Sequence, residues 1–143
     1  MKDDLLDICR RAARECTANQ LRRASRQMTA VFDDAIADSG LRGTQFSLLT
    51  ALAVGGEMPL SRLAEVLSLD RTTLTRNLAP LGRDGLVTNL PSPDGRVRTI
   101  AMTQRGLEAL ERALPRWQAA QNQVMKALGR RRWQELLATL GEL

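Results

Sequence analysis

Apolar side chains recur every three or four residues along most of the chain, which is the spacing of one face of an α-helix. The segments with this spacing cover residues 5–16, 21–35, 44–54, 60–67, 71–83 and 107–128, and a short one follows residue 129. Three of these segments end close to a glycine, at Gly40, Gly55 or Gly129, as is typical of helix ends. The pattern therefore predicts a largely helical chain.

Several residues predict where helices begin. Thr17 and Gln20 fit a capping box, so we expect a break in the first helical stretch with Thr17 as N-cap. Pro59 is expected in the first turn of the helix over residues 60–67. Asp70 and Thr103 are predicted N-caps of the helices that follow them.

The spacing of apolar residues changes after Gly85. Residues 86–90 and 97–102 read as two strands, joined by a loop over residues 91–96 that is rich in proline and glycine. The predicted fold class is therefore mostly α with a small β-hairpin.

The last long helix carries a heptad-like seam. Its members alternate at spacings of three and four: Leu107, Leu110, Leu114, Trp117, Gln121, Val124 and Leu128. The seam either packs within the chain or against a second copy, and its length favours the second copy. Pro115 is expected to kink this helix.

The composition narrows the function classes. The chain has 143 residues, of which 43% are hydrophobic, so it fits one compact core with an extended appendage rather than a disordered segment. No apolar run is long enough to span a bilayer, and the charged start leads into no apolar signal core. We therefore expect a cytoplasmic protein with no membrane association.

The absence of histidine removes much chemistry. A Ser-His-Asp triad, a Cys-His pair and an HExxH zinc site are excluded, and two cysteines are too few for a structural zinc site. No glycine-rich phosphate loop or paired acid and base stands out, so we expect neither an enzyme nor a cofactor or metal. A net charge of +5 and a pI near 10.5 point to an acidic partner, with nucleic acid ahead of an anionic membrane surface.

The helix over residues 71–83 has two contrasting faces. Leu74, Leu78 and Leu81 lie on one side, and the other side holds small, hydroxyl and basic residues: Thr72, Thr75, Arg76, Ala79 and Arg83. Such a face can approach a major groove closely, with Thr bonding phosphates or bases and Arg gripping guanine. Its alternative interpretation is ordinary solvated surface.

These segments, in this order, resemble a winged helix-turn-helix of the MarR family of transcriptional regulators. The matching motifs are Asp70-Arg71-Thr72-Thr73-Leu74-Thr75-Arg76-Asn77-Leu78 and the wing run Asp94-Gly95-Arg96-Val97-Arg98-Thr99-Ile100-Ala101-Met102-Thr103, followed by Gly106. The resemblance implies helical dimerisation regions over residues 1–39 and 104–143 around a DNA-binding domain over residues 40–103. It further implies a homodimer on double-stranded DNA, acting as a repressor on a roughly palindromic operator.

The resemblance also assigns roles to individual residues. Five positions of the recognition helix would meet phosphates or base edges: Thr72, Thr73, Thr75, Arg76 and Asn77. Arg71 is a further candidate because it lies at the N-terminal end of this helix, where free N–H groups and the helix dipole favour phosphate. Arg96 would be the groove contact of the wing tip, with Asp94 and Arg98 shaping it; alternatively, Arg98 pairs with Asp94 to brace the hairpin. The chain departs from the family pattern at Gly95, where arginine is frequent, and at Pro80 within the recognition helix.

The sequence does not decide whether the signal that regulates DNA binding is an oxidant or a ligand. Cys9 and Cys16 lie on one apolar stripe, either as inert core or as a thiol sensor next to basic residues. A ligand typical of the family would be a small aromatic acid, whose carboxylate Arg22 or Arg26 would pair. Two further classes remain beside the repressor, namely a winged-helix module that docks another protein and a thiol enzyme such as a peroxidase.

Overall fold

The computed structural model of the chain describes residues 2–92 and 95–143. Along these residues the elements are α1 (Lys2–Glu15), α2 (Thr17–Ile36), the short 3₁₀ turn η1 (Ala37–Ser39), α3 (Gly43–Gly55), β1 (Met58–Pro59), α4 (Leu60–Val66), α5 (Arg71–Arg83), β2 (Val87–Leu90), β3 (Thr99–Met102), α6 (Gln104–Leu128) and α7 (Arg130–Gly141). The chain is mostly helical with one small antiparallel sheet, which confirms the predicted fold class.

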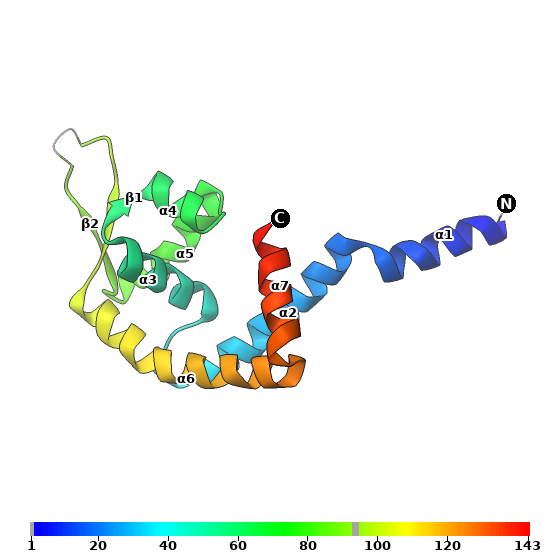
Figure 1. Cartoon of the computed structure of the whole chain (residues 1–143). Helices are drawn as coiled ribbons and strands as arrows, with labels where there is room; N and C mark the ends of the chain where they lie inside the picture. Colours follow the sequence, from blue (N-terminus) through cyan, green and yellow to red (C-terminus); the bar gives the residue numbers. More distant parts are fainter. Residues whose placement is uncertain (1, 93–94) are drawn as a thin grey trace.

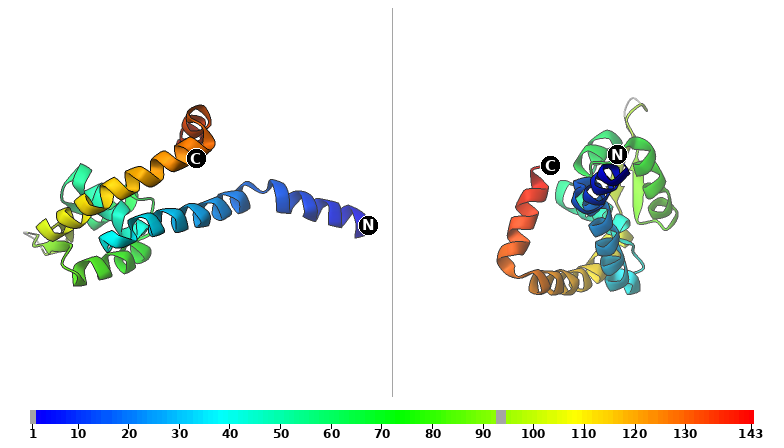
Figure 2. Two further views of the ribbon diagram at one scale, coloured as in Figure 1. Left: turned by 90° about the horizontal axis from the view of Figure 1, so that it is seen from below. Right: turned by 90° about the vertical axis from the view of Figure 1, so that its right-hand side faces the viewer.

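The elements divide into a compact head and extended arms (Figure 1). We call α3, α4, α5 and the sheet the head, and α1, α2, α6 and α7 the arms. Helices α2 and α6 pack against each other, while α1 projects away from the rest of the molecule, as Figure 1 and the left view of Figure 2 show. The arms therefore carry most of their surface outside the head.

The core of the head is built from leucines contributed by each of its helices. Leu49 of α3, Leu63 of α4 and Leu74 and Leu81 of α5 have no exposed surface, and Leu78 is 3% exposed. Burying one leucine side chain contributes about 1.5–3 kcal/mol. The predicted apolar stripe of α5 is thus confirmed, and it fixes which face of that helix turns outward.

The sheet contains one strand more than the sequence predicted. Its order is β1-β3-β2, with Met58 opposite Ile100 and Val87 opposite Met102. The two-residue strand β1 was missed because it pairs only with the distant β3. The predicted strand over residues 97–102 is too long at its start, since β3 begins at Thr99.

Two predicted caps are confirmed and two predictions about helix starts are wrong. The Thr73 N–H donates to Asp70 Oδ1 at 2.8 Å, and the Gly106 N–H donates to Thr103 Oγ1 at 3.1 Å. The break near Thr17 is present, but Cys16 is the N-cap of α2. The Gln20 amide instead donates across the break to the carbonyl of Arg14 at 2.8 Å, so no capping box forms.

Pro59 stands one position earlier than expected. It is the N-cap of α4 rather than a residue of its first turn, with an extended backbone at φ −58° and ψ 148°. The reason is its membership of β1, where it pairs with Thr99 of β3. A proline is tolerated in such an edge strand because it lacks only a donor that the outer edge does not use.

The seam of α6 is divided between two surroundings. Leu110 is buried and Trp117 packs on the core, while Leu107, Leu114 and Leu128 are between 36% and 41% exposed. The intrachain face of α6 uses smaller side chains instead, namely Gly106, Ala109, Ala113 and Ala120. The helix runs through Pro115 without interruption.

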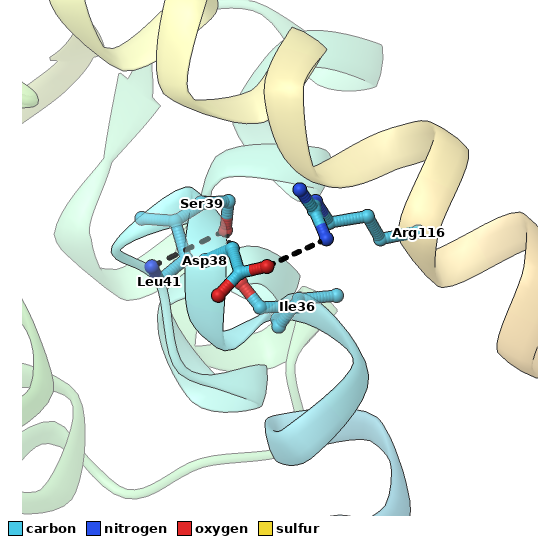
Figure 3. Close-up of polar contacts among 5 residues, drawn as sticks. All are labelled: Ile36, Asp38, Ser39, Leu41 and Arg116. Atoms are coloured by element: carbon cyan, nitrogen blue, oxygen red, sulfur yellow. Dashed lines mark hydrogen bonds and ion pairs between the residues drawn. The ribbon is translucent and has the colours of Figure 1, made fainter.

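A polar junction joins α6 to the corner that follows α2 (Figure 3). The guanidinium of Arg116 on α6 donates to Asp38 Oδ2 at 2.9 Å, and the two side chains point toward one another. The buried Ser39 hydroxyl donates to the carbonyl of Ile36 at 2.5 Å and accepts from the Leu41 N–H at 3.3 Å. These bonds fix the corner where the chain passes from α2 into the head.

Candidate nucleic-acid interface

Helix α5 begins at a well-formed cap. Both the hydroxyl and the N–H of Thr73 donate to the Asp70 carboxylate, at 2.6 Å and 2.8 Å. These two hydrogen bonds hold the pKa of Asp70 below its ordinary value. The bond from the Thr73 hydroxyl has the larger effect, and the bond from the Thr73 N–H has the next largest. Because the cap takes up the Thr73 N–H, the first turn starts at a defined residue, Arg71.

The outward face of α5 is uncovered and basic. Thr72, Thr75 and Arg76 are exposed, as is Arg71 at the N-terminal end. Within residues 2–92 and 95–143, neither Arg71 nor Arg76 forms an ion pair with a carboxylate. Hydroxyl groups and guanidinium groups on one helical face can donate to phosphate oxygens and to the acceptor edges of bases.

The other two predicted residues of α5 lie on its flanks. The half-buried Thr73 spends its hydroxyl on Asp70, so it shapes the helix start as well as lying near its outer face. Asn77 is also half-buried and lines a pocket at the back of the helix. The sequence places both on the helix correctly, but their burial depends on what packs beside α5.

Pro80 does not end the recognition helix. Helix α5 continues through it to Arg83, and the Asp84 N–H donates to the carbonyl of Pro80 at 3.0 Å. The Thr72, Thr75 and Arg76 side chains all lie ahead of this proline, so their spacing is that of a regular helix.

The hairpin between β2 and β3 supplies a second basic element. Arg96 and Arg98 are exposed, and Gly95 adopts a left-handed backbone with φ 65°. The Arg98 Nε donates to Asn89 Oδ1 at 2.6 Å, which ties it across the hairpin. Asp94 lies outside the described residues, so its predicted roles beside Arg96 and Arg98 stay predictions.

A pocket of about 550 Å³ lies behind α5, between the head and the arms. It is lined by residues of α2, α3 and α6, by Leu67 and Leu69 between α4 and α5, and by Asn77 of α5. Neither Arg22 nor Arg26, which the sequence suggested for binding a carboxylate, is among the described residues that line it. The pocket was missed at the level of sequence because its walls come from segments far apart in the chain.

The cysteines are separate from this pocket. Cys9 is exposed on α1, Cys16 is half-buried at the start of α2, and both are free thiols. No group of three or more Cys, Asp or Glu side chains in the described ranges is arranged to hold a metal ion. None of the helices formed by those residues is both long and apolar enough to cross a bilayer.

Comparison with known proteins gives a consistent result. The sequence model of the MarR family matches residues 41–97. The transcriptional regulator MosR of M. tuberculosis, solved in complex with DNA, is 39% identical, with a TM-score of 0.80 over 90% of this chain and 95% of that chain. A search among curated proteins gave no match.

Two further solved structures are similar at lower identity. The transcriptional repressor CouR bound to a 23-mer DNA duplex is 25% identical, with a TM-score of 0.83 over 92% of this chain and 94% of that chain. A probable transcriptional regulator from Pseudomonas aeruginosa is also 25% identical, with a TM-score of 0.81 over 90% of this chain and 96% of that chain.

Proposed function

The chain belongs to the MarR family and is a DNA-binding transcriptional regulator, and from this premise we propose that it is a homodimeric repressor of a roughly palindromic operator. In this proposal residues 40–103 form the DNA-binding domain, and residues 1–39 and 104–143 form the dimerisation regions. A signal bound or sensed by the protein releases it from the operator.

The observation that carries the proposed DNA contact is the orientation of α5. The leucines of its buried stripe are at most 3% exposed. Rotation of the helix about its axis would expose them and is therefore strongly disfavoured. The opposite face, with Thr72, Thr75 and Arg76, is exposed. We assign this face to the major groove and the exposed wing residue Arg96 to the adjacent minor groove.

Support for a homodimer comes from apolar surface on the arms. Helices α1 and α7 bury none of their residues, although they carry large apolar side chains. Those that are between 40% and 60% exposed are Leu5, Leu6, Ile8, Leu136, Leu137 and Leu140. Such patches on projecting helices are typical of surfaces that a second subunit covers. A two-fold dimer would place two heads about one DNA turn apart, on the order of 34 Å.

Release follows if the signal changes the separation or tilt of the two heads. Only a conformer that sets both heads into successive grooves keeps the full set of phosphate contacts. Two sources of signal have a structural basis. The pocket behind α5 can hold a ligand, and Cys9 and Cys16 are free thiols on which an oxidant can act.

Gel-shift titrations at several salt concentrations test the assignment of the groove contacts. Arg76→Ala should weaken operator binding by about 1–3 kcal/mol and relax the base preference at one position. Arg96→Ala should weaken binding more evenly across sequences and reduce the salt slope by about one. Arg131→Ala removes the same charge from α7, outside the head, and serves as the control once its oligomeric state is shown to equal that of wild type. Unchanged affinity in both head variants would contradict the proposal.

A winged-helix module that docks another protein is the competing function. It predicts no salt-dependent binding of duplex DNA by the purified chain, so the same titration separates the two. A thiol enzyme would consume peroxide with turnover, and this activity would disappear in Cys9→Ser or Cys16→Ser.

A further inference from the structure

Arg98 lies at the root of the wing, where the hairpin between β2 and β3 joins the rest of the sheet. Its carbonyl accepts from the N–H of Leu60, the first residue of α4, at 2.9 Å. Two residues further along, Ile100 is 1% exposed and pairs with Asn89 of β2. The backbone of Arg98 therefore has a fixed place relative to the head, and it lies two residues closer to β3 than Arg96 does.

Asn89 holds the guanidinium of Arg98 from the opposite strand. The Arg98 Nε donates to Asn89 Oδ1 at 2.6 Å. Because Asn89 pairs with Ile100, Arg98 is its diagonal neighbour, and the two side chains share one face of the hairpin. The bond uses Nε alone. Within residues 2–92 and 95–143, neither terminal nitrogen of Arg98 forms an ion pair with a carboxylate.

The amide of Asn89 orients Arg98 without neutralising it. A carboxylate at position 89 would form an ion pair and cancel most of the charge that attracts DNA. The amide oxygen is an uncharged acceptor, so the guanidinium keeps its full charge while one of its five N–H groups is held in place. The other N–H groups can bind two oxygens of one phosphate in a bidentate manner.

Resting on the proposed function, we propose that Asn89 is a positioning residue that presents Arg98 to a phosphate of the DNA backbone. In the proposed function α5 occupies the major groove and Arg96 the adjacent minor groove. The backbone that separates these grooves passes the root of the wing, where Arg98 is fixed. An exposed arginine otherwise samples many rotamers, and ordering it on binding costs affinity. Asn89 restricts these rotamers before DNA binds.

A double-mutant cycle with Asn89→Ala and Arg98→Ala tests the positioning role. The probe is one duplex that the wild-type chain selects from a random pool, and affinity is measured by gel shift at several salt concentrations. Asn89→Ala should weaken binding about threefold to tenfold in the wild-type chain, but less than about twofold beside Arg98→Ala. Arg98→Ala alone should weaken binding at least as much and reduce the salt slope by about one, because one phosphate contact disappears.

A second variant separates orientation from charge. Asn89→Asp keeps an acceptor for the Arg98 Nε but adds a negative charge beside it. It should retain the melting temperature of the wild type, yet weaken DNA binding and reduce the salt slope by about one, as Arg98→Ala does. Thr88→Asp is the matched control. It adds the same charge at the neighbouring exposed position, on the opposite face of β2, and should have a smaller effect on both quantities.

Equal weakening by Asn89→Ala with and without Arg98 would overturn the inference, because Asn89 would then act only through the stability of the hairpin. Unchanged affinity of Asn89→Ala would overturn it as well. A phosphate contact also requires that Arg98→Ala lose the same factor on a duplex of unrelated sequence, and a loss confined to the selected duplex would contradict it.

Binding by the wild-type chain is measured first, so that the two levels of the argument can fail separately. Absent salt-dependent binding of duplex DNA would contradict the proposed function. Intact binding with independent effects at positions 89 and 98 would contradict only the positioning role of Asn89.

Discussion

Gly106 stands where the first turn of α6 meets the base of the wing, and it has no room for a side chain. A Cβ at this position would lie 2.8 Å from Met102 Cγ and 3.1 Å from the carbonyl carbon of Leu86, and closer still to the Leu86 oxygen. Contacts below 3.0 Å essentially never occur for a real Cβ, so Gly106→Ala requires that a neighbour move.

The Leu86 backbone cannot give way cheaply. Its carbonyl accepts from the Thr103 N–H at 3.0 Å, and its own N–H donates to the carbonyl of Leu81 at 2.8 Å. Movement of Leu86 therefore disturbs the end of α5, the start of β2 and the cap of α6 together. Overpacking of this kind costs about 1–3 kcal/mol, and we expect the upper half of that range. For a chain of this size the melting temperature should fall by about 5–10 °C.

Gly82 provides the matched control. It also lies in a helix, α5, but an added Cβ would meet no atom within 4 Å. Gly82→Ala should therefore stabilise the protein by up to about 1 kcal/mol, because alanine loses less backbone entropy on folding. Thermal and urea unfolding of both variants measure the difference. Equal stabilities, or a stabilised Gly106→Ala, would refute the account of this close contact.

Three further predictions concern the cap, the junction and the thiols. Since the pKa of Asp70 is lowered in the folded protein, its charged form stabilises the fold above the ordinary aspartate pKa, and this stabilisation is lost as pH falls through the lowered value. The difference in unfolding free energy between wild type and Asp70→Ala should be constant near neutral pH and shrink in acid; a difference that grows in acid would contradict this. The Asp38–Arg116 pair is largely exposed, so Asp38→Asn should cost at most about 1 kcal/mol and less at high salt. Urea unfolding at two salt concentrations checks it, and a larger, salt-independent loss would be inconsistent with an exposed pair. If oxidation is the signal, peroxide should weaken operator binding of wild type but not of Cys9→Ser or Cys16→Ser; equal loss in all three would exclude these thiols as the sensor.

Local sequence signals predicted the elements that depend on local interactions. Asp70 and Thr103 cap helices through residues only three positions away, and the leucine stripe of α5 follows directly from helical spacing. The sequence also predicted the two strands after Gly85, because the spacing of apolar residues there is no longer helical. These features require no knowledge of distant parts of the chain.

Features that depend on distant partners were not predictable. Strand β1 exists only because Met58 meets Ile100 of β3. The seam of α6 is interrupted because small residues such as Ala113, rather than Leu114, face the rest of the chain. In the same way, helical spacing alone places Asn77 on the outward side of α5. Its position in the pocket depends on α2, α3 and α6, which pack behind that helix.

Selection of bound duplexes from a random pool by the purified full-length chain tests the central claim most directly. The account predicts enrichment of inverted repeats whose half-sites are centred about one helical turn apart, with weaker enrichment by Arg76→Ala. Recovery of duplexes without any shared sequence, or of single half-sites without a two-fold partner, would contradict a dimer that reads DNA through the exposed face of α5.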